Sequence, residues 1–372
     1  MAIARIGIRA ALIVGCVVAG RAYAQSGDSA VAERLDSIRL KHNVPALGAA
    51  FIRRDGSITF AVVGVRKRGT DLRATIEDQW LLGSNTKAMT ATLLATFVEQ
   101  GALTWETTLA ELFPELRARF RGNFGAITVT HLLTHYAGLD RDLNWSDIRH
   151  STPAVTQQRL NSVRKAGSKR LRSLPGTKME YSNLGYVIAG AVAERVGGKS
   201  WEALIRERVF TSLGMSGCGF GGPGTPGQLD QPWPHNPNGN PGGPRSWLDV
   251  EDVVAPAGRV RCSLADWAKF LLDQLRGANG KGALLKSETY TALHEARFGG
   301  TYAFGWSVAS APWADGVVLN HTGSNGMNFC FAWIAPARDV ALLAVTNRGG
   351  DAGGKATVEA SEALIRLYGL VK

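Results

Sequence analysis

The strongest constraint on the fold is a predicted helix with apolar residues on almost every side. Met89, Leu93 and Phe97 recur every four residues, and the positions between them are mostly small or aliphatic. A helix that is apolar all round is buried, and Gly101 is the residue type best suited to a left-handed helix end. With 372 residues, 45% of them hydrophobic, the chain can bury a core that surrounds this helix.

Polar groups cluster at the N-terminal end of this buried helix, where Ser84, Asn85 and Lys87 lie within one turn. Burying an ammonium group needs a reason. Residues three apart share a helix face, so the Lys87 amine can lie beside the Ser84 hydroxyl and act as its base once burial lowers the lysine pKa. An N-cap serine followed by a surface lysine is the alternative, and S-x-x-K alone does not decide between the two.

Residues 1–24 have the features of a secretory signal. Arg5 and Arg9 precede an apolar stretch that is too short to span a membrane, and an A-x-A pattern ends at Ala24. We expect cleavage after Ala24 and a mature protein that is periplasmic or secreted, with no stable membrane span. A lipoprotein signal ending at Cys16 is the second choice, and a retained N-terminal anchor is the third.

The chain is basic. Its formal net charge of +11 falls by three, to +8, when the three arginines of the signal are removed, and much of the excess lies in residues 161–178. This stretch either attracts an anionic partner or is a solvated surface segment. No aromatic interleaving or nucleic-acid motif accompanies it, so we favour a solvated segment and expect no nucleic-acid partner.

The cysteines and histidines do not predict a metal site. Cys218, Cys262 and Cys330 remain after cleavage, and an odd number permits at most one internal disulfide. His131 and His135 share a helix face, but there is no HExxH motif, so we expect a structural role for them. We expect neither a metal nor an organic cofactor.

Strand patterns lie near both ends of the chain, and helical patterns lie between them. We predict strands over 46–54, 57–65, 302–310, 317–323, 327–335 and 339–347, and helices over 28–42, 263–275 and 354–368. This order indicates an α/β (α+β) fold with one antiparallel sheet built from both termini. We expect a single catalytic domain over 25–372, with a sheet lobe (25–125 and 255–372) and a helical and loop lobe (126–254). Residues 217–244 are too rich in glycine and proline for regular structure.

Two further motifs accompany Ser84 and Lys87. Tyr181 and Asn183 are two apart just before a predicted helix, so their side chains can point the same way. A phenol can relay a proton, and a carboxamide can hold both a lysine and a substrate carbonyl. His321, Thr322 and Gly323 end a predicted strand, and the next backbone N–H, that of Ser324, can join that of Ser84 in an oxyanion hole.

These motifs, S-x-x-K, Y-x-N and (K/H)-T-G in this order, resemble those of the serine β-lactamase and penicillin-binding protein superfamily. The tyrosine version is similar to the class C branch, which also includes DD-peptidases and β-lactamase-like esterases. The resemblance covers roughly residues 30–365. It implies a five-stranded antiparallel sheet flanked by helices plus an all-helical lobe.

The resemblance also implies the roles of the site residues. Ser84 would be acylated, Lys87 would be its basic partner, Tyr181 the proton relay and Asn183 the orienting residue. Ser84 and Ser324 would supply the oxyanion-hole N–H groups. The expected activity is that of an exported serine hydrolase acting on small ester, peptide or β-lactam substrates. The alternative is a penicillin-recognising binding or sensor protein that acylates but barely turns over.

The third motif departs from the class C pattern, because His321 replaces lysine. An imidazole is mostly neutral near pH 7 unless its surroundings hold the proton, so capture of a substrate carboxylate is in doubt. Within the family that the chain resembles, histidine at this place occurs in some DD-peptidases and in many β-lactamase-like esterases. We therefore expect esters or D-amino-acid peptides as substrates. We expect His321, Thr322 and Gly323 to line the substrate site, and Asn347 and Arg348 to contribute a contact and the missing positive charge. An ordinary turn is the alternative for Asn347 and Arg348.

Overall fold

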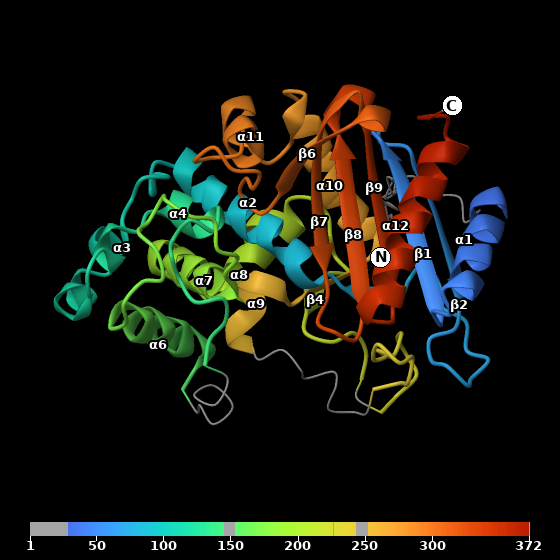
Figure 1. The fold of residues 1–372 in the computed structure, drawn as a ribbon, viewed down its shortest axis with the longest axis horizontal. Helices are drawn as coiled ribbons and strands as arrows, with labels where there is room; N and C mark the ends of the chain where they lie inside the picture. The colour runs from blue at the N-terminus through green and yellow to red at the C-terminus, as the bar shows by residue number, and fades with distance from the viewer. Residues whose placement is uncertain (1–28, 145–152, 226, 243–251, 372) are drawn as a thin grey trace, which may run out of the picture.

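A computed structural model describes residues 29–144, 153–225, 227–242 and 252–371. The predicted signal, its cleavage position and Cys16 lie outside the described residues. The chain forms a sheet covered by helices and, beside it, a lobe of helices, as Figure 1 shows. The sheet is built from both ends of the described chain, as predicted.

The main sheet has six strands in the order β2-β1-β9-β8-β7-β6, and every neighbouring pair is antiparallel. Its strands are β1 (Ala46–Arg53), β2 (Ile58–Gly64), β6 (Ser307–Ala311), β7 (Gly316–Gly323), β8 (Phe329–Ala335) and β9 (Val340–Thr346). The expected number of five strands is wrong. The sheet has six, with β2 paired to β1 at one edge and β6 paired to β7 at the other. Strand β6 starts later than predicted, since residues 302–306 pair only through the single bridge Tyr302–Ser307.

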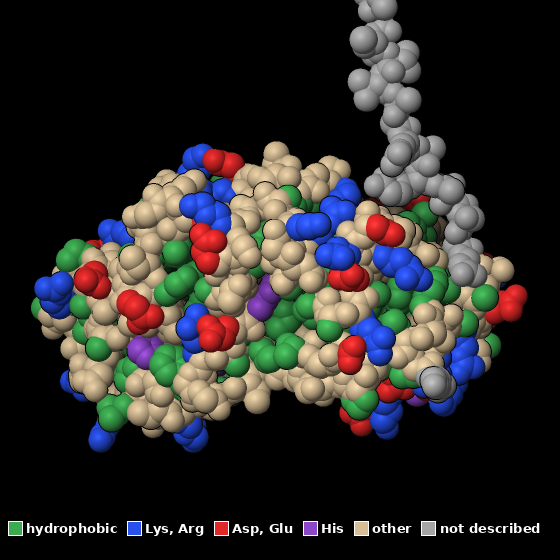
Figure 2. All heavy atoms as spheres, turned by 90° about the horizontal axis from the view of Figure 1, so that it is seen from above, with side chains coloured by type: hydrophobic (Ala, Val, Ile, Leu, Met, Phe, Trp, Pro, Cys, Tyr) green, Lys and Arg blue, Asp and Glu red, His purple; other side chains and the backbone are tan. Residues whose placement is uncertain are grey.

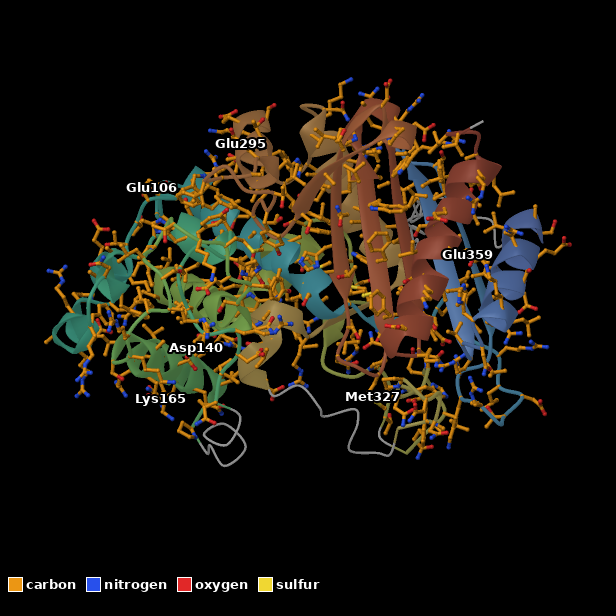
Figure 3. All side chains as sticks on the ribbon, viewed as in Figure 1. Glu106, Asp140, Lys165, Glu295, Met327 and Glu359 are labelled. Carbon is orange, nitrogen blue, oxygen red and sulfur yellow. A yellow bond between two sulfur atoms is a disulfide. The ribbon has the colours of Figure 1, made fainter. Side chains whose placement is uncertain are left out.

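Helices cover both faces of the main sheet. On one face α1 (Ser29–Lys41) and α12 (Gly350–Leu367) pack on the strands, and α1 buries the predicted Val31, Leu35 and Ile38. Glu359 of α12 ties the two helices together by accepting hydrogen bonds from Lys41 Nζ at 2.8 and 2.9 Å (Figure 3). On the other face α10 (Leu264–Ala278) packs on β1, β8 and β9.

The second lobe is helical. It contains α3 (Leu109–Leu112), α4 (Val129–Leu133), α6 (Val155–Gly167), α7 (Asn183–Gly197) and α8 (Trp201–Ile205), while α9 (Ala255–Gly258) and α11 (Ser287–His294) follow later in the chain. The sequence assigns residues 109–125 to the sheet lobe, but they pack with the helical lobe. Arg121 donates its backbone N–H to Gly167 at the end of α6, where Phe120 and Phe124 also pack.

Helix α2 (Thr86–Glu99) lies between the two parts of the molecule. It packs on α7 and α9 and against α11, and eleven of its residues are buried. Gly101 follows with φ of +70°, as the predicted left-handed stop requires. The prediction of a buried helix is therefore confirmed, with only Thr96, Val98 and Glu99 of α2 partly exposed.

A small second sheet joins the loop region to the start of α2. It consists of β3 (Gln79–Leu81), β5 (Val260–Ser263) and β4 (Gly219–Phe220) in the order β3-β5-β4. The expectation that residues 217–244 lack regular structure is wrong for β4, which pairs with β5 because the disulfide Cys218–Cys262 holds the two segments together.

The basic stretch 161–178 continues from α6 into a surface loop. Arg172 and Lys178 approach Glu180 at 3.4 and 3.3 Å. On the face drawn in Figure 2, basic and acidic side chains are interspersed. The ion pairs of Arg172 and Lys178 with Glu180 agree with a solvated surface segment.

Candidate active site

Ser84 lies on a 3-10 turn (Gly83–Asn85) that leads into α2 and packs on the end of β7. Gly83 has φ of +50°, and a Cβ placed there would come within 2.6 Å of the Ser324 backbone nitrogen. The turn therefore packs against the Ser324 backbone at a distance that leaves no room for a side chain at position 83. This contact brings the first and third sequence motifs together.

Lys87 is fully buried at the start of α2. Its Nζ lies 3.0 Å from Ser84 Oγ and 2.8 Å from both Asn183 Oδ1 and the Ala257 carbonyl oxygen. Burial lowers the pKa of Lys87 well below its usual value, Asp142 opposes this shift and Arg141 adds to it. A neutral amine has two N–H groups and one lone pair. In its neutral form the amine would direct its two N–H groups to the acceptors at 2.8 Å and its lone pair to the Ser84 hydroxyl.

Tyr181 and Asn183 reach the same point from the start of α7. Ser182 caps this helix, since its Oγ accepts from the Gly185 N–H at 2.9 Å. The residues on either side of this cap therefore turn to Lys87, whose Nζ lies 4.9 Å from the centre of the Tyr181 ring. Burial raises the pKa of Tyr181 to about 12, and a hydrogen bond with Ser84 opposes the rise. The phenol thus keeps its proton at neutral pH.

Asp142 and Arg141, which belong to none of the three sequence motifs, also reach this site. The Asp142 carboxylate accepts a hydrogen bond from Asn183 Nδ2 at 2.7 Å. The Arg141 guanidinium lies 5.5 Å from the centre of the Tyr181 ring. Both residues precede Asn183 by about 40 positions, and only tertiary packing brings them to it.

His321 is buried in an aromatic cluster with Tyr181, Tyr302 and His135. Its Nδ1 lies 2.6 Å from the Thr322 carbonyl oxygen and its Nε2 lies 2.9 Å from the Tyr302 hydroxyl. A carbonyl can only accept, so Nδ1 carries the hydrogen and Nε2 accepts from the hydroxyl. Burial, with a smaller effect of Lys87, lowers the pKa of His321 to about 3. The imidazole is therefore neutral, while Thr322, the next residue of β7, is exposed.

Asn347 and Arg348 do not have the expected contacts. Asn347 is buried and its side chain binds backbone, accepting from the Ala46 N–H at 2.9 Å and donating to the Arg66 carbonyl at 3.0 Å. The Arg348 guanidinium donates to the carbonyl oxygens of Asn43 and Pro237, both at 2.7 Å. These bonds hold the guanidinium, which remains a cation, between the end of β9 and two neighbouring loops.

The remaining histidines and cysteines named above make contacts that stabilise the fold. His131 closes a capping box with Thr128 at the start of α4. His135 Nδ1 accepts from the Ser182 N–H at 3.1 Å. Cys218 and Cys262 form a disulfide, within the limit of one that the odd number of cysteines permits, and Cys330 is a buried free thiol.

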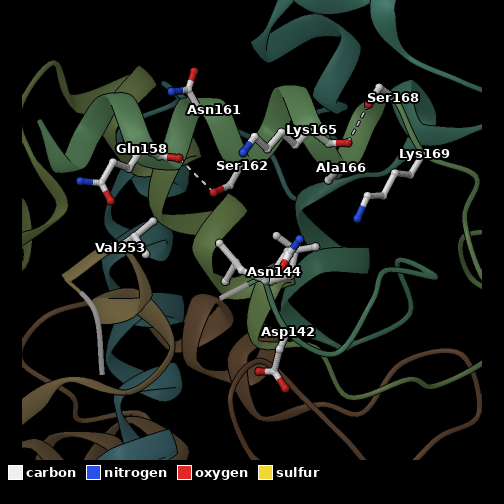
Figure 4. Close-up of a pocket in the computed structure, with 12 residues that line it drawn as sticks. Asp142, Asn144, Gln158, Asn161, Ser162, Lys165, Ala166, Ser168, Lys169 and Val253 are labelled. Carbon is white, nitrogen blue, oxygen red and sulfur yellow. Dashed lines mark hydrogen bonds between the residues drawn. The ribbon is translucent and has the colours of Figure 1, made fainter. Parts of the chain in front are cut away.

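A cavity of about 350 Å³ lies beside the site and is bordered by Asp142 and Leu184. In Figure 4, Ser162 of α6 and Lys169, which follows α6, lie on one side of the cavity, and Asn144 and Asp142 lie on the other. Asp142, which borders this cavity, is also the residue that contacts Asn183.

The sequence and the fold match known proteins. The family model described as Beta-lactamase matches residues 27–365. Penicillin-binding protein 4 of Amycolatopsis lactamdurans is 26% identical over 340 residues, which cover 85% of this chain and 84% of that protein.

Solved structures with the same fold include a β-lactamase/D-alanine carboxypeptidase from Pseudomonas syringae, with a TM-score of 0.74 and 18% identity over 93% of this chain and 99% of that one. Another is an octameric penicillin-binding protein homologue from Pyrococcus abyssi, with a TM-score of 0.73 and 22% identity over 92% of this chain and 77% of that one. The chain belongs to the Beta-lactamase family of serine hydrolases.

Proposed function

We propose that this protein is an exported serine hydrolase that forms an acyl-enzyme at Ser84 and releases it to water. The observation that carries the proposal is the buried Lys87 amine, which lies 3.0 Å from Ser84 Oγ with its other two hydrogen-bonding positions occupied. A serine hydroxyl is a weak nucleophile until a base takes its proton. A lysine with a strongly lowered pKa supplies that base at neutral pH.

In the proposed reaction Ser84 Oγ attacks the substrate carbonyl carbon while its proton passes to Lys87 Nζ. The N–H groups of Ser84 and Ser324 stabilise the oxyanion. The bond to the leaving group then breaks, and Tyr181 delivers a proton to the leaving atom and regains one from Lys87. Water then attacks the ester carbonyl, one of its protons passes through Lys87 to Ser84 Oγ as the acyl bond breaks, and the carboxylic acid leaves. The high pKa of Tyr181, about 12, keeps a proton available for the leaving group.

We propose esters or D-amino-acid peptides rather than β-lactams as preferred substrates. β-Lactams carry a carboxylate that a cation can hold. His321 is neutral with both ring nitrogens bonded, and the Arg348 guanidinium binds backbone carbonyls. The neutral His321 ring therefore gives no support to carboxylate capture at the third motif, and the Arg348 cation is held by backbone carbonyls at the end of β9.

Export is the second part of the proposal. Disulfides persist mainly in oxidising compartments, and the Cys218–Cys262 bond is consistent with a periplasmic or secreted protein. Across the residues that the structure describes, we find no helix with the length and apolar character of a membrane span. The alternative function is a penicillin-binding or sensor protein that acylates but barely turns over, and the relative named penicillin-binding protein 4 supports that alternative.

The proposal is tested with a p-nitrophenyl butyrate assay, a chromogenic cephalosporin assay and intact-mass detection of the acyl-enzyme. We compare wild type with Ser84→Ala and with Ser212→Ala, a control at an exposed serine of the helical lobe. Ester turnover with little cephalosporin hydrolysis, abolished only in Ser84→Ala, is the expected result. Stoichiometric labelling without turnover would establish the alternative, and full activity in Ser84→Ala would refute a nucleophilic role.

A further inference from the structure

We propose that Asp142 is a positioning residue of the hydrolase, which fixes the side-chain amide of Asn183 against Lys87. The inference rests on the proposed function, because it concerns the base of that reaction. It adds a fourth member to the chain of contacts that begins at the Ser84 hydroxyl.

The contacts form a continuous series of short hydrogen bonds. Asn183 Nδ2 donates to Asp142 Oδ1 at 2.7 Å, and Lys87 Nζ donates to Asn183 Oδ1 at 2.8 Å. Lys87 in turn lies 3.0 Å from Ser84 Oγ. The amide therefore has one end on the carboxylate and the other on the amine.

The chemistry of the carboxylate determines which end of the amide faces Lys87. An ionised carboxylate only accepts hydrogen bonds, whereas an amide has a donor end and an acceptor end. With Asp142 beside it, Asn183 must direct its NH₂ group to the carboxylate and its oxygen to Lys87. The opposite orientation would place two acceptors against each other and two donors on the lysine.

Hydrogen bonds attach the backbone around Asp142 to the start of α7. They hold the Asp142 carboxylate beside the Asn183 amide. The Asn183 N–H donates to the Arg141 carbonyl at 2.7 Å, and Ser182 Oγ donates to the Asp140 carbonyl at 2.6 Å. The Asp142 side chain keeps about a third of its surface exposed. It can thus remain a solvated carboxylate while one oxygen holds the amide.

Asp142 also places a negative charge near the base. Lys87 is faced by the titratable and charged side chains Tyr181, Tyr186, Asp142, Arg141, His135 and His321. Both histidines are buried and have lowered pKa values, and burial raises the pKa of both tyrosines. The charges that act on Lys87 at neutral pH are therefore Asp142, which favours its protonated form, and Arg141, which opposes it.

The test compares the pH profile of kcat/KM for p-nitrophenyl butyrate in wild type, Asp142→Asn, Asp142→Ala and Asp140→Asn. The control Asp140 is two residues away in the same segment, and its carboxylate faces Lys169 and Arg172 at 3.9 Å instead of Asn183. Asp142→Asn keeps an acceptor for Asn183 but removes the charge.

We expect Asp142→Asn to lower the midpoint of the acid limb by about 0.5 to 1 pH unit, because Lys87 loses its protons more easily. Asp142→Ala should show the same shift and a kcat lower by about 10- to 100-fold, since the amide loses its anchor. Asp140→Asn should match wild type.

An Asp142→Asn profile that coincides with wild type would overturn the charge effect, and an unchanged kcat in Asp142→Ala would overturn the positioning role. Thermal melts of each variant show whether a loss of activity comes from misfolding or from a mispositioned amide. An Asp142→Ala variant that melts like wild type and keeps full activity contradicts the inference. Failure of the proposed function is distinct, since wild type would then form no acyl-enzyme at Ser84.

Discussion

Gly83 allows the turn that carries Ser84 to pack against the end of β7. Its φ of +50° is in the left-handed region that favours glycine, and a Cβ would lie 2.6 Å from the Ser324 nitrogen and 2.9 Å from the Gly323 carbonyl carbon. Both atoms are backbone and cannot move aside alone. A single methyl group at this position would therefore separate the two segments that supply the proposed oxyanion hole.

We predict that Gly83→Ala lowers kcat for p-nitrophenyl butyrate by about 10²-fold or more, the scale of losing one oxyanion-hole donor. The matched control is Gly101→Ala, which also imposes a side chain at a positive φ, +70°, but has no atom within 4 Å of the new Cβ. Backbone strain of about 1–2 kcal/mol should appear in urea unfolding of both variants. Equal kcat values in the two variants would disprove the effect on the site.

The start of α2 is held in place by an element far away in the sequence. Leu82 donates its N–H to the Val260 carbonyl at 2.8 Å, and the Val260 N–H donates to Thr86 Oγ1 at 3.1 Å. These bonds attach β5 to both sides of the turn that carries Ser84. The disulfide Cys218–Cys262 joins the same strand to β4, across a sequence separation of 44 residues.

We predict that the double variant Cys218→Ala, Cys262→Ala is less stable than wild type by about 3–4 kcal/mol, the loop-entropy value for a crosslink of this span. Urea unfolding with and without a reductant measures it. The reductant should destabilise wild type by a similar amount and leave the double variant unchanged. If it affects both proteins equally, the crosslink is not the source of the difference.

At the scale of the whole molecule, histidines are buried as neutral rings at several junctions. His235 Nδ1 lies 2.9 Å from the Asn347 carbonyl oxygen, and its Nε2 accepts from the Arg68 N–H at 3.1 Å. His321 has the same arrangement with the Thr322 carbonyl and the Tyr302 hydroxyl. Protonation would add a hydrogen to a nitrogen that already accepts one, and burial lowers the pKa of His235 to about 4 and that of His321 to about 3.

We predict that stability decreases as pH falls below about 6.5, the unfolded-state pKa of histidine. Near pH 5 the unfolded chain holds a proton on each ring and the folded chain does not, so the two histidines contribute a loss of about 2.7 kcal/mol per pH unit. Proton uptake during urea unfolding at pH 5 should be about one lower in His235→Gln, which keeps a donor and an acceptor. At pH 8 the two proteins should take up equal numbers of protons, and an equal uptake at pH 5 would contradict this account.

Much of the fold could be predicted because local patterns and tertiary packing agree. The Asp55-Gly56 hairpin between β1 and β2 and the Ser263 cap of α10 occur where predicted. The number of strands was wrong where it came from the resemblance, although the sequence patterns themselves predict all six strands of the main sheet. Strand β4 was missed because its two residues depend on β5 and a disulfide rather than on their own β propensity.

The pairing of Ser84 with Lys87 could be predicted from the chain alone, because residues three positions apart at the start of a helix lie on one face. Tyr181 and Asn183 could also be predicted, because they lie on either side of Ser182, the residue that caps α7. Tertiary structure alone decided that the Arg348 guanidinium binds loop carbonyls and that the His321 ring is neutral. It also brought Asp142 to Asn183, because a contact across 41 positions depends on how the 140–142 segment packs against the start of α7 and has no periodicity along the chain.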